Sequence, residues 1–229
     1  MPLPLPSSAP GRADAPPELS FVVEDAGAVR FAAVPTLTLT LRIERVGGGP
    51  VRSIALNTQI RIAATQRSYE VSEQERLVEL FGRSDQWDKS LHSMLWTNIA
   101  ANVPAFTDST LFELSVPCTY DLEVSAGKYF QALKGGEIPL ELLFGGTVFY
   151  PQPGGQLQIS PIPWSQEVDF RLPLGVWNET MDYYFPNSAW LRLGRASFDR
   201  LCAYRARHTL PTWEATMERL LRDEPEEDA

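Results

Sequence analysis

Apolar and polar residues alternate along much of the chain between residues 19 and 172, as they do in strands that bury one face. The clearest example is Thr36–Glu44, where every second side chain is apolar. The alternation resumes over residues 54–62, beyond a glycine-rich turn at residues 47–50. Two such runs around a short glycine turn predict a β-hairpin.

The phase of this alternation predicts which side chains are buried. Leu39 and Ile60 occupy the apolar phase of the two runs and are expected in the core. Thr38 and Gln59 occupy the opposite phase and are expected to face solvent. A slip of one residue in either strand would exchange the two faces, so the assignment can be tested residue by residue.

Further runs with strand character, separated by turns, fill the rest of this region. They are residues 19–24, 29–33, 96–103, 112–116, 120–124, 138–150 and 168–172. The pair Gly145-Gly146, inside one of these runs, predicts a β-bulge. So many short strands with turns between them favour an antiparallel arrangement.

Helical patterns interrupt the strands and then replace them. A capping box at Ser72 and Glu75 predicts a short helix over residues 73–81, and another is expected over residues 125–133. After Pro173, apolar residues recur at helical spacing in three successive segments. They are Trp177, Met181 and Tyr184 in the first, Phe198, Leu201 and Cys202 in the second, and Trp213, Met217, Leu220 and Leu221 in the third.

This order of elements predicts a mainly β fold of the α+β kind, an antiparallel β-sandwich with short inserted helices and a C-terminal helical cap. The expected domain organisation has four parts. They are a disordered proline-rich arm at residues 1–18, a β-sandwich domain at residues 19–173, a helical cap at residues 174–222 packed on the same domain, and a disordered acidic tail at residues 223–229.

The net charge of −9 over 229 residues disfavours binding to nucleic acid or to an anionic membrane. The sequence holds no run of about 18 apolar residues and opens on no cationic, apolar leader with a cleavage site. We therefore expect a cytoplasmic protein that does not enter the membrane. In that compartment Cys118 and Cys202 would stay reduced.

Few residues are suited to catalysis or metal binding. The two histidines, His92 and His208, and the two cysteines are not spaced as metal ligands, and no nucleophile or phosphate-loop motif occurs. We therefore expect a non-enzymatic protein with no catalytic residue, no cofactor and no metal site. The carboxylates that could serve a glycosidase, which the sequence alone cannot pair, are Asp121, Glu123, Glu141, Asp169 and Glu179.

Aromatic and basic residues gather in the last third of the chain. The candidates for a partner surface are Trp190, Tyr204, Arg205, Arg207 and Trp213. Tryptophan and tyrosine also fill packing layers, because each buries a large area, so the same residues could lie between the cap helices and the sheet. Both interpretations stay open at the level of the sequence.

Several short motifs resemble those of a known family. They are Leu95-Trp96-Thr97, Pro117-Cys118-Thr119-Tyr120-Asp121, Gly136-Glu137-Ile138-Pro139-Leu140, Gly146-Thr147-Val148-Phe149-Tyr150 and Leu210-Pro211-Thr212-Trp213. Over residues 19–222 the chain resembles an uncharacterised, mainly actinobacterial family classed as a domain of unknown function. The resemblance implies an accessory or assembly role near nickel–iron hydrogenases, and it transfers no catalytic residue.

Two functions of different class follow. The first is a non-enzymatic protein-binding or accessory module, associated with a hydrogenase if the resemblance extends so far. The alternative is a carbohydrate or small-molecule site, binding or hydrolytic, in a cleft between the sheet and the helical cap. Converging carboxylates in a cleft would favour the second, and an apolar patch with a polar rim would favour the first.

Overall fold

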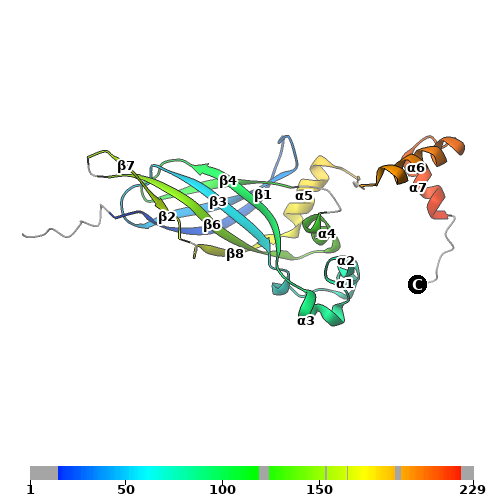
Figure 1. Cartoon of the computed structure of the whole chain (residues 1–229), viewed down its shortest axis with the longest axis horizontal. Coiled ribbons are helices and arrows are strands. Elements are labelled where there is room, and N and C mark those ends of the chain that lie inside the picture. The colour runs from blue at the N-terminus through cyan, green and yellow to red at the C-terminus, as the bar shows by residue number, and fades with distance from the viewer. Residues whose placement is uncertain (1–14, 119–123, 153, 164, 189–191, 223–229) are drawn as a thin grey trace, which may run out of the picture. The chain divides into compact units, whose positions relative to one another are not determined.

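The computed structural model describes residues 15–118, 124–152, 154–163, 165–188 and 192–222 (Figure 1). The chain divides into two compact units, residues 1–190 and residues 191–229. Most of the predicted arm at residues 1–18, and all of the predicted tail at residues 223–229, lie outside the described residues.

One sheet of the first unit consists of β1 (Glu18–Val29), β2 (Thr36–Gly47) and β5 (Ser109–Pro117), antiparallel and in the order β1-β2-β5. The central strand β2 carries the clearest alternation in the sequence. Its apolar side chains, Leu37, Leu39, Leu41 and Ile43, are fully buried. The predicted phase of this strand is confirmed, since Thr38 on its other face is only partly buried.

The other sheet has five strands. They are β3 (Ser53–Ile62), β4 (Met94–Val103), β6 (Glu137–Pro151), β7 (Leu157–Pro161) and β8 (Glu167–Pro173). Strand β3 lies between β4 and β6, while β7 and β8 both pair with β6, one after the other along its length. Every pairing is antiparallel, so the predicted mainly β, antiparallel fold is confirmed.

The expected hairpin between residues 36–44 and 54–62 is wrong, because β2 and β3 belong to different sheets. The glycine turn carries the chain across the core instead of folding it back on itself. Strand β2 is already flanked by β1 and β5, and β3 by β4 and β6. Alternation requires only that each strand bury one face, and two facing sheets satisfy that requirement as well as one hairpin does.

The predicted bulge at Gly145-Gly146 is also misplaced. Strand β6 pairs with β3 from Ser53 opposite Phe149 to Ile62 opposite Leu140 without a register shift. The irregularity lies on the other side of β6, where β7 and β8 are separate strands. Gly146 has a φ of 128°, and a Cβ there would lie 2.0 Å from the carbonyl oxygen of Ala55, so only glycine fits.

The core of the first unit lies between the two sheets. Phe21 of β1 stacks on Phe144 of β6 with ring centroids 4.4 Å apart, which fixes the inner faces against each other. The same cluster includes Leu39, Ile60 and the α5 residue Trp177. The first unit is therefore an antiparallel sandwich whose core extends under helix α5.

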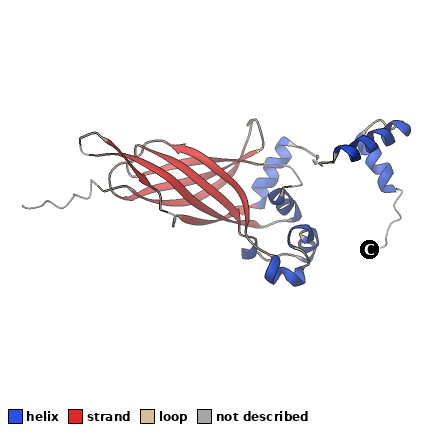
Figure 2. Ribbon diagram, in the orientation of Figure 1, coloured by secondary structure: helices blue, strands red, loops and turns tan. Residues whose placement is uncertain are grey.

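The helices of the first unit gather at one end of the sheets (Figure 2). They are α1 (Val71–Arg76), α2 (Val78–Phe81), α3 (Trp87–Ser90), α4 (Ser125–Ala132) and α5 (Leu174–Tyr184), with 3-10 turns η1 (Ala64–Gln66) and η2 (Ser84–Gln86). Helix α5 is tied to the β1–β2 turn by Tyr184, whose hydroxyl donates to the carbonyl of Val29 at 3.0 Å and accepts from the amide of Ala32 at 2.7 Å.

The second unit contains α6 (Arg195–Arg207) and α7 (Trp213–Arg222). A cation–π contact of 4.8 Å places the Arg205 guanidinium over the Trp213 ring, and Phe198 packs on the same ring with centroids 5.5 Å apart. Arg205 also donates to the carbonyls of Leu210 and Pro211, at 3.2 and 3.1 Å. One arginine therefore closes the turn between the two helices.

Among the described residues, no helix combines the length and apolar character that crossing a membrane requires.

Candidate functional site

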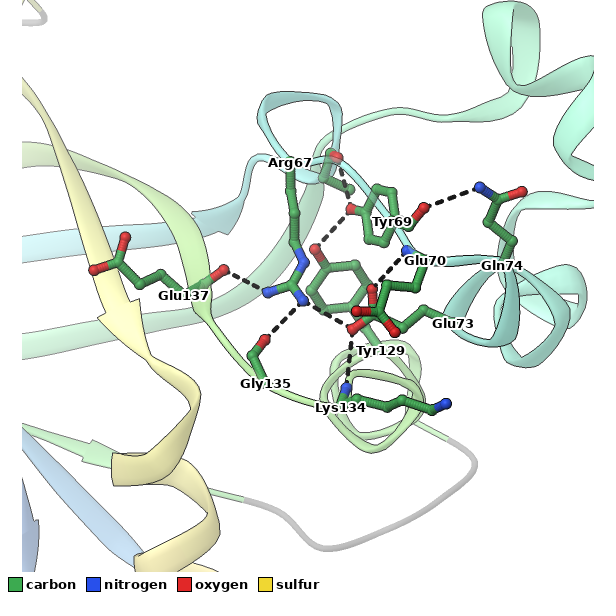
Figure 3. Close-up of polar contacts among 10 residues, drawn as sticks. Arg67, Tyr69, Glu70, Glu73, Gln74, Tyr129, Lys134, Gly135 and Glu137 are labelled. Atoms are coloured by element: carbon green, nitrogen blue, oxygen red, sulfur yellow. Dashed lines mark hydrogen bonds and ion pairs between the residues drawn. The ribbon is translucent and has the colours of Figure 1, made fainter.

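A buried polar cluster joins α1 to the segment before β6 (Figure 3). Its centre is Glu73, whose side chain is 3% exposed. One carboxylate oxygen accepts from Arg67 at 2.8 Å and from the backbone amide of Lys134 at 2.9 Å. The other accepts from the backbone amide of Glu70 at 3.1 Å. Both oxygens of a buried charge are thus satisfied, as burial requires.

Arg67 connects this carboxylate to the main chain on the far side of the cluster. It donates to the carbonyls of Glu137 and Gly135, at 2.6 and 2.7 Å. Its side chain is 12% exposed, and its Nε is buried without a hydrogen-bond partner in the described part of the chain. A planar guanidinium that reaches three acceptors from fixed directions holds two segments in register.

Two tyrosines complete the cluster. Their hydroxyl oxygens, on Tyr69 and Tyr129, are 2.8 Å apart, and the Tyr69 hydroxyl lies 2.6 Å from the carbonyl of Ala64. Since a carbonyl only accepts, Tyr69 donates to Ala64 and Tyr129 donates to Tyr69. The carbonyl of Tyr69 also accepts from the Gln74 side chain at 3.0 Å. The direction of every hydroxyl is therefore set.

Burial and hydrogen bonding move the pKa values in this cluster in opposite directions. Burial alone would raise the pKa of Glu73, but the amides of Lys134 and Glu70 and the Arg67 guanidinium outweigh it and hold that pKa below its usual range. Burial raises the pKa of Tyr69 and of Tyr129. At neutral pH the carboxyl is an anion and both phenols are neutral.

Apart from the Nε of Arg67, the polar groups of this cluster bind one another or the neighbouring main chain. Both Glu73 oxygens accept hydrogen bonds, and each phenol donates one to a neighbour. The arrangement therefore fastens the helical insertion that begins at Glu70 to the strand that begins at Glu137. It accounts for fold stability and supplies no reacting group.

The sequence pointed to this region but at the wrong residues. The predicted capping box at Ser72 and Glu75 lies two positions too late, because the box is formed by Glu70 as N-cap and Glu73. The helix predicted over 73–81 is instead two short helices, α1 and α2, with Leu77 between them. Glutamate is an uncommon N-cap, so no ordinary sequence signal marks it.

The residues predicted as a partner surface belong to the second unit or border it. Trp190 lies outside the described residues. Arg205 and Trp213 contact each other and stabilise the turn between α6 and α7. Tyr204 and Arg207 line a groove beside α7 and remain available to a partner.

This groove, which we call the α6 groove, has a volume of about 530 Å³. It is lined by Ser197, Arg200, Leu201, Ala203, Tyr204, Arg207 and Leu220. Spacings of three and four residues put most of these on one side of α6. The groove combines two arginines with an aromatic and two leucine side chains.

The isolated candidates for chemistry stay apart. Cys118 is 6% exposed, and burial raises the pKa of its thiol to about 12, so it is an inert core residue. Cys202 is half-buried, and both cysteines are free thiols. The Nδ1 of His92 donates to the carbonyl of Ser90 at 2.6 Å, and His208 packs on Tyr204. Nowhere in the described chain do three metal-ligating side chains converge.

Of the candidate carboxylates, the structure brings Glu141 and Asp169 together, directly opposite on β6 and β8. Asp121 and Glu123 lie outside the described residues. Glu141 is already bound by Arg61 at 3.7 Å and by the Gln66 side chain at 3.3 Å. The pair therefore resembles a charged sheet surface more than a site with one protonated and one ionised carboxyl.

Comparison with family models gives one match over almost the whole chain. The model of DUF6084, a family of unknown function, matches residues 16–229. The family described from the sequence motifs as a domain of unknown function is thereby confirmed. No curated protein matches the chain significantly.

Solved structures resemble it only distantly. The putative ApaA protein from Bordetella pertussis is 16% identical with a TM-score of 0.26, over 69% of this chain and 96% of that one. Spo0M, a sporulation control protein from Bacillus subtilis, is 9% identical with a TM-score of 0.27, over 68% and 49%. β-Glucosidase 3B from Thermotoga neapolitana is 15% identical with a TM-score of 0.25, over 68% and 17%. Scores this low carry no argument about function.

Proposed function

The chain belongs to the family of unknown function DUF6084, and because membership brings no activity with it, we propose from its own geometry that it is a protein-binding module. The second unit carries the binding surface. The accessory role beside a nickel–iron hydrogenase, which the motifs imply, is part of this proposal as one identity for the partner.

The observation that carries the proposal is the lack of burial in the second unit. Among the described residues of α6 and α7, Thr216 alone is buried, and every apolar side chain keeps part of its surface exposed. Helices of 13 and 10 residues are marginal in water without burial of an apolar face. A partner that covers this face would supply the missing burial.

The chemistry of the α6 groove indicates what kind of partner fits. Residues 192–222 hold seven arginines against three acidic residues, on a chain whose net charge is −9. Arg200 and Arg207 flank Tyr204, with Leu201 and Leu220 beside them. An acidic segment with apolar side chains would pair with the guanidinium groups and cover the leucines.

The test compares the wild type with a double variant, Arg200→Gln with Arg207→Gln, in affinity capture from the native host followed by mass spectrometry. Arg219→Gln is the matched control, because Arg219 is an exposed arginine of α7 that does not line the groove. Partners lost by the double variant and kept by the control are then purified and titrated at two salt concentrations.

We expect the double variant to lose at least one partner that binds more weakly at high salt, since exposed charge pairs are screened. Circular dichroism should show the same helix content in all three proteins. An identical set of captured proteins from wild type and double variant would refute the α6 groove as the binding surface.

A further inference from the structure

The outer face of the five-stranded sheet, in the first unit, is hollowed by a second groove of about 460 Å³. It is lined by Asn57, Thr58, Gln59, Asn98, Ile99, Ala100, Leu143, Phe144 and Gly145, from the adjacent strands β4, β3 and β6. The side chains of Thr58 and Phe144 are buried on the core side of the sheet, so these two residues border the groove with their backbone. The groove therefore opens on the face away from the core. We call it the amide groove.

The strand register explains why the face is hollow at this point. Asn57 lies opposite Ala100 on one side and Gly145 on the other. Opposing residues point to the same face of a sheet, so a methyl group and a hydrogen atom form the floor. Gln59 lies opposite Asn98 and Leu143, whose longer side chains form one wall.

Three carboxamides border this floor, and none of them has a hydrogen-bond partner in the described part of the chain. The side chains of Asn57, Gln59 and Asn98 make no hydrogen bond to any described residue. Their neighbours on the same face behave differently, since Arg61 pairs with Glu141 at 3.7 Å. The amide groove therefore offers donors and acceptors among lining residues that carry no charge, with Glu167 of β8, opposite Leu143, as a neighbouring carboxylate.

We propose that the amide groove binds a neutral oligosaccharide. Each carboxamide presents two N–H donors and one carbonyl acceptor, which matches hydroxyl groups that both donate and accept. The floor of Ala100 and Gly145 lets a sugar ring approach the strands closely, and Leu143 offers an apolar contact. An anionic ligand would find no counter-charge among the lining residues, on a chain that carries a net charge of −9.

The site binds its ligand without cleaving it. Hydrolysis of a glycosidic bond requires two facing carboxyl groups beside the sugar. The described residues that line the groove include no carboxylate. Glu167 lies beside it, opposite Leu143, and Glu141, two residues beyond Leu143, is held by Arg61 and Gln66, so no two carboxylates face each other across the floor. This site lies on the first unit and is independent of the partner surface proposed for the second.

Isothermal titration of the full chain with maltopentaose, cellopentaose, xylopentaose and mannopentaose tests the proposal, with trigalacturonic acid as a charged comparison. At least one neutral pentasaccharide should bind with a Kd below about 1 mM, and the acid should not bind. Asn57→Ala, Gln59→Ala and Asn98→Ala should each weaken binding roughly five- to tenfold, the usual effect of one lost hydrogen bond.

Asn102→Ala is the matched control, because Asn102 is an exposed asparagine of β4 that faces Ala55 and does not line the groove. Gly145→Val gives a second, steric test. A Cβ at Gly145 meets no heavy atom within 4 Å, so the strand accepts the side chain while the floor is filled and all three carboxamides stay. Binding should be lost in this variant and unchanged in the control.

Absence of binding by all four neutral sugars would overturn the proposal. Equal affinity of wild type and Gly145→Val would also overturn it, because the sugar would then occupy another part of the molecule. Denaturant melts of each variant, expected within about 0.5 kcal/mol of the wild type for exposed positions, show that lost binding is not lost folding.

Discussion

The two units of this chain contrast in what they bury. In the first unit the inner faces of both sheets, together with α4 and α5, form one apolar core, and even a charged residue, Glu73, is buried with its partners in place. In the second unit the described helices bury Thr216 alone. The first unit therefore buries an extensive apolar core, while the described helices of the second leave every apolar side chain partly exposed.

This difference separates two roles that a single sequence pattern can suggest. A stripe of apolar and aromatic residues on a helix looks the same whether it is core or binding surface. Trp177 and Trp213 both occur at helical spacing, yet Trp177 is 4% exposed within the core, whereas Trp213 is partly exposed and contacts Arg205 and Phe198 of its own unit. The contrast leads to predictions in which the two units respond differently.

The largest effect on stability is expected from Glu73→Gln in the first unit. The substitution keeps the shape of the side chain but leaves Arg67 as a buried cation without a counter-charge, and it sets an amide N–H against backbone donors. Loss of one member of a buried ion pair costs about 3–5 kcal/mol. Urea melts measure the free energy of unfolding.

The matched control is Glu79→Gln, on the same helical insertion. Glu79 also forms an ion pair, with Lys128, but its side chain is 71% exposed. An exposed pair contributes about 1 kcal/mol or less. Equal losses in the two variants would mean that the cluster around Glu73 does not fasten the insertion.

Truncation of the sandwich core comes next. Leu39→Ala and Ile60→Ala should each cost about 2–5 kcal/mol, because both side chains are fully buried and their removal leaves a cavity. Thr38→Ala and Gln59→Ala, on the opposite faces, should cost about 0.5 kcal/mol or less. The reverse order in denaturant melts would show that the strand register is wrong by one residue.

The sequence was sufficient for most strands and their faces but not for their pairing. It also placed a strand over residues 29–33, where β1 ends at Val29 and a turn follows, and it missed β7. Period-two alternation depends only on each strand having one buried face, so the burial of Leu39 and Ile60 could be predicted. Which strands lie side by side depends on contacts between distant segments. The predicted hairpin failed for that reason, since β2 pairs with β1 and β5 and not with β3.

The candidate sites were harder to predict than the fold. The cluster around Glu73 joins residues 67–74 to residues 129–137. No local sequence pattern predicts a contact between segments so far apart in the sequence. The amide groove is formed by residues that the sequence shows only as polar members of alternating strands. By contrast, Tyr204 and Arg207 could be chosen from the sequence as candidates for a partner surface, because their spacing places them on the same side of one helix, α6.

Acid should weaken the first unit through Glu73. Its pKa lies below the usual value in the folded state, held there by the two amides and Arg67 against the effect of burial. The stabilisation is therefore complete above the ordinary glutamate pKa of about 4.3 and is lost as the pH falls through the folded value. Urea melts between pH 7 and pH 3 should show this loss in the wild type, and Glu73→Gln should show less of it.

The two cysteines offer a chemical comparison of the units. Cys118 is buried in the sandwich with a pKa of about 12, whereas Cys202 on α6 is half-buried. At pH 8 a disulfide reagent should therefore label Cys202 at least tenfold faster than Cys118, because the thiolate is the reacting form. Cys202→Ser removes the fast phase, and denaturant should make Cys118 react. Equal rates in the folded protein would contradict a closed sandwich core.

The smallest effect is expected from removal of the whole second unit, residues 191–229. The buried apolar side chains of the described chain all lie between Leu19 and Met181, so the truncated protein should unfold within about 0.5 kcal/mol of the wild type. It should also lose the partners that depend on Arg200 and Arg207. A fall of several degrees in Tm, with new binding of a hydrophobic dye, would instead support the helical cap packed on the sandwich that the sequence predicts. Because one deletion reports on both stability and partner binding, it separates a helix pair that completes the fold from one that completes an interface.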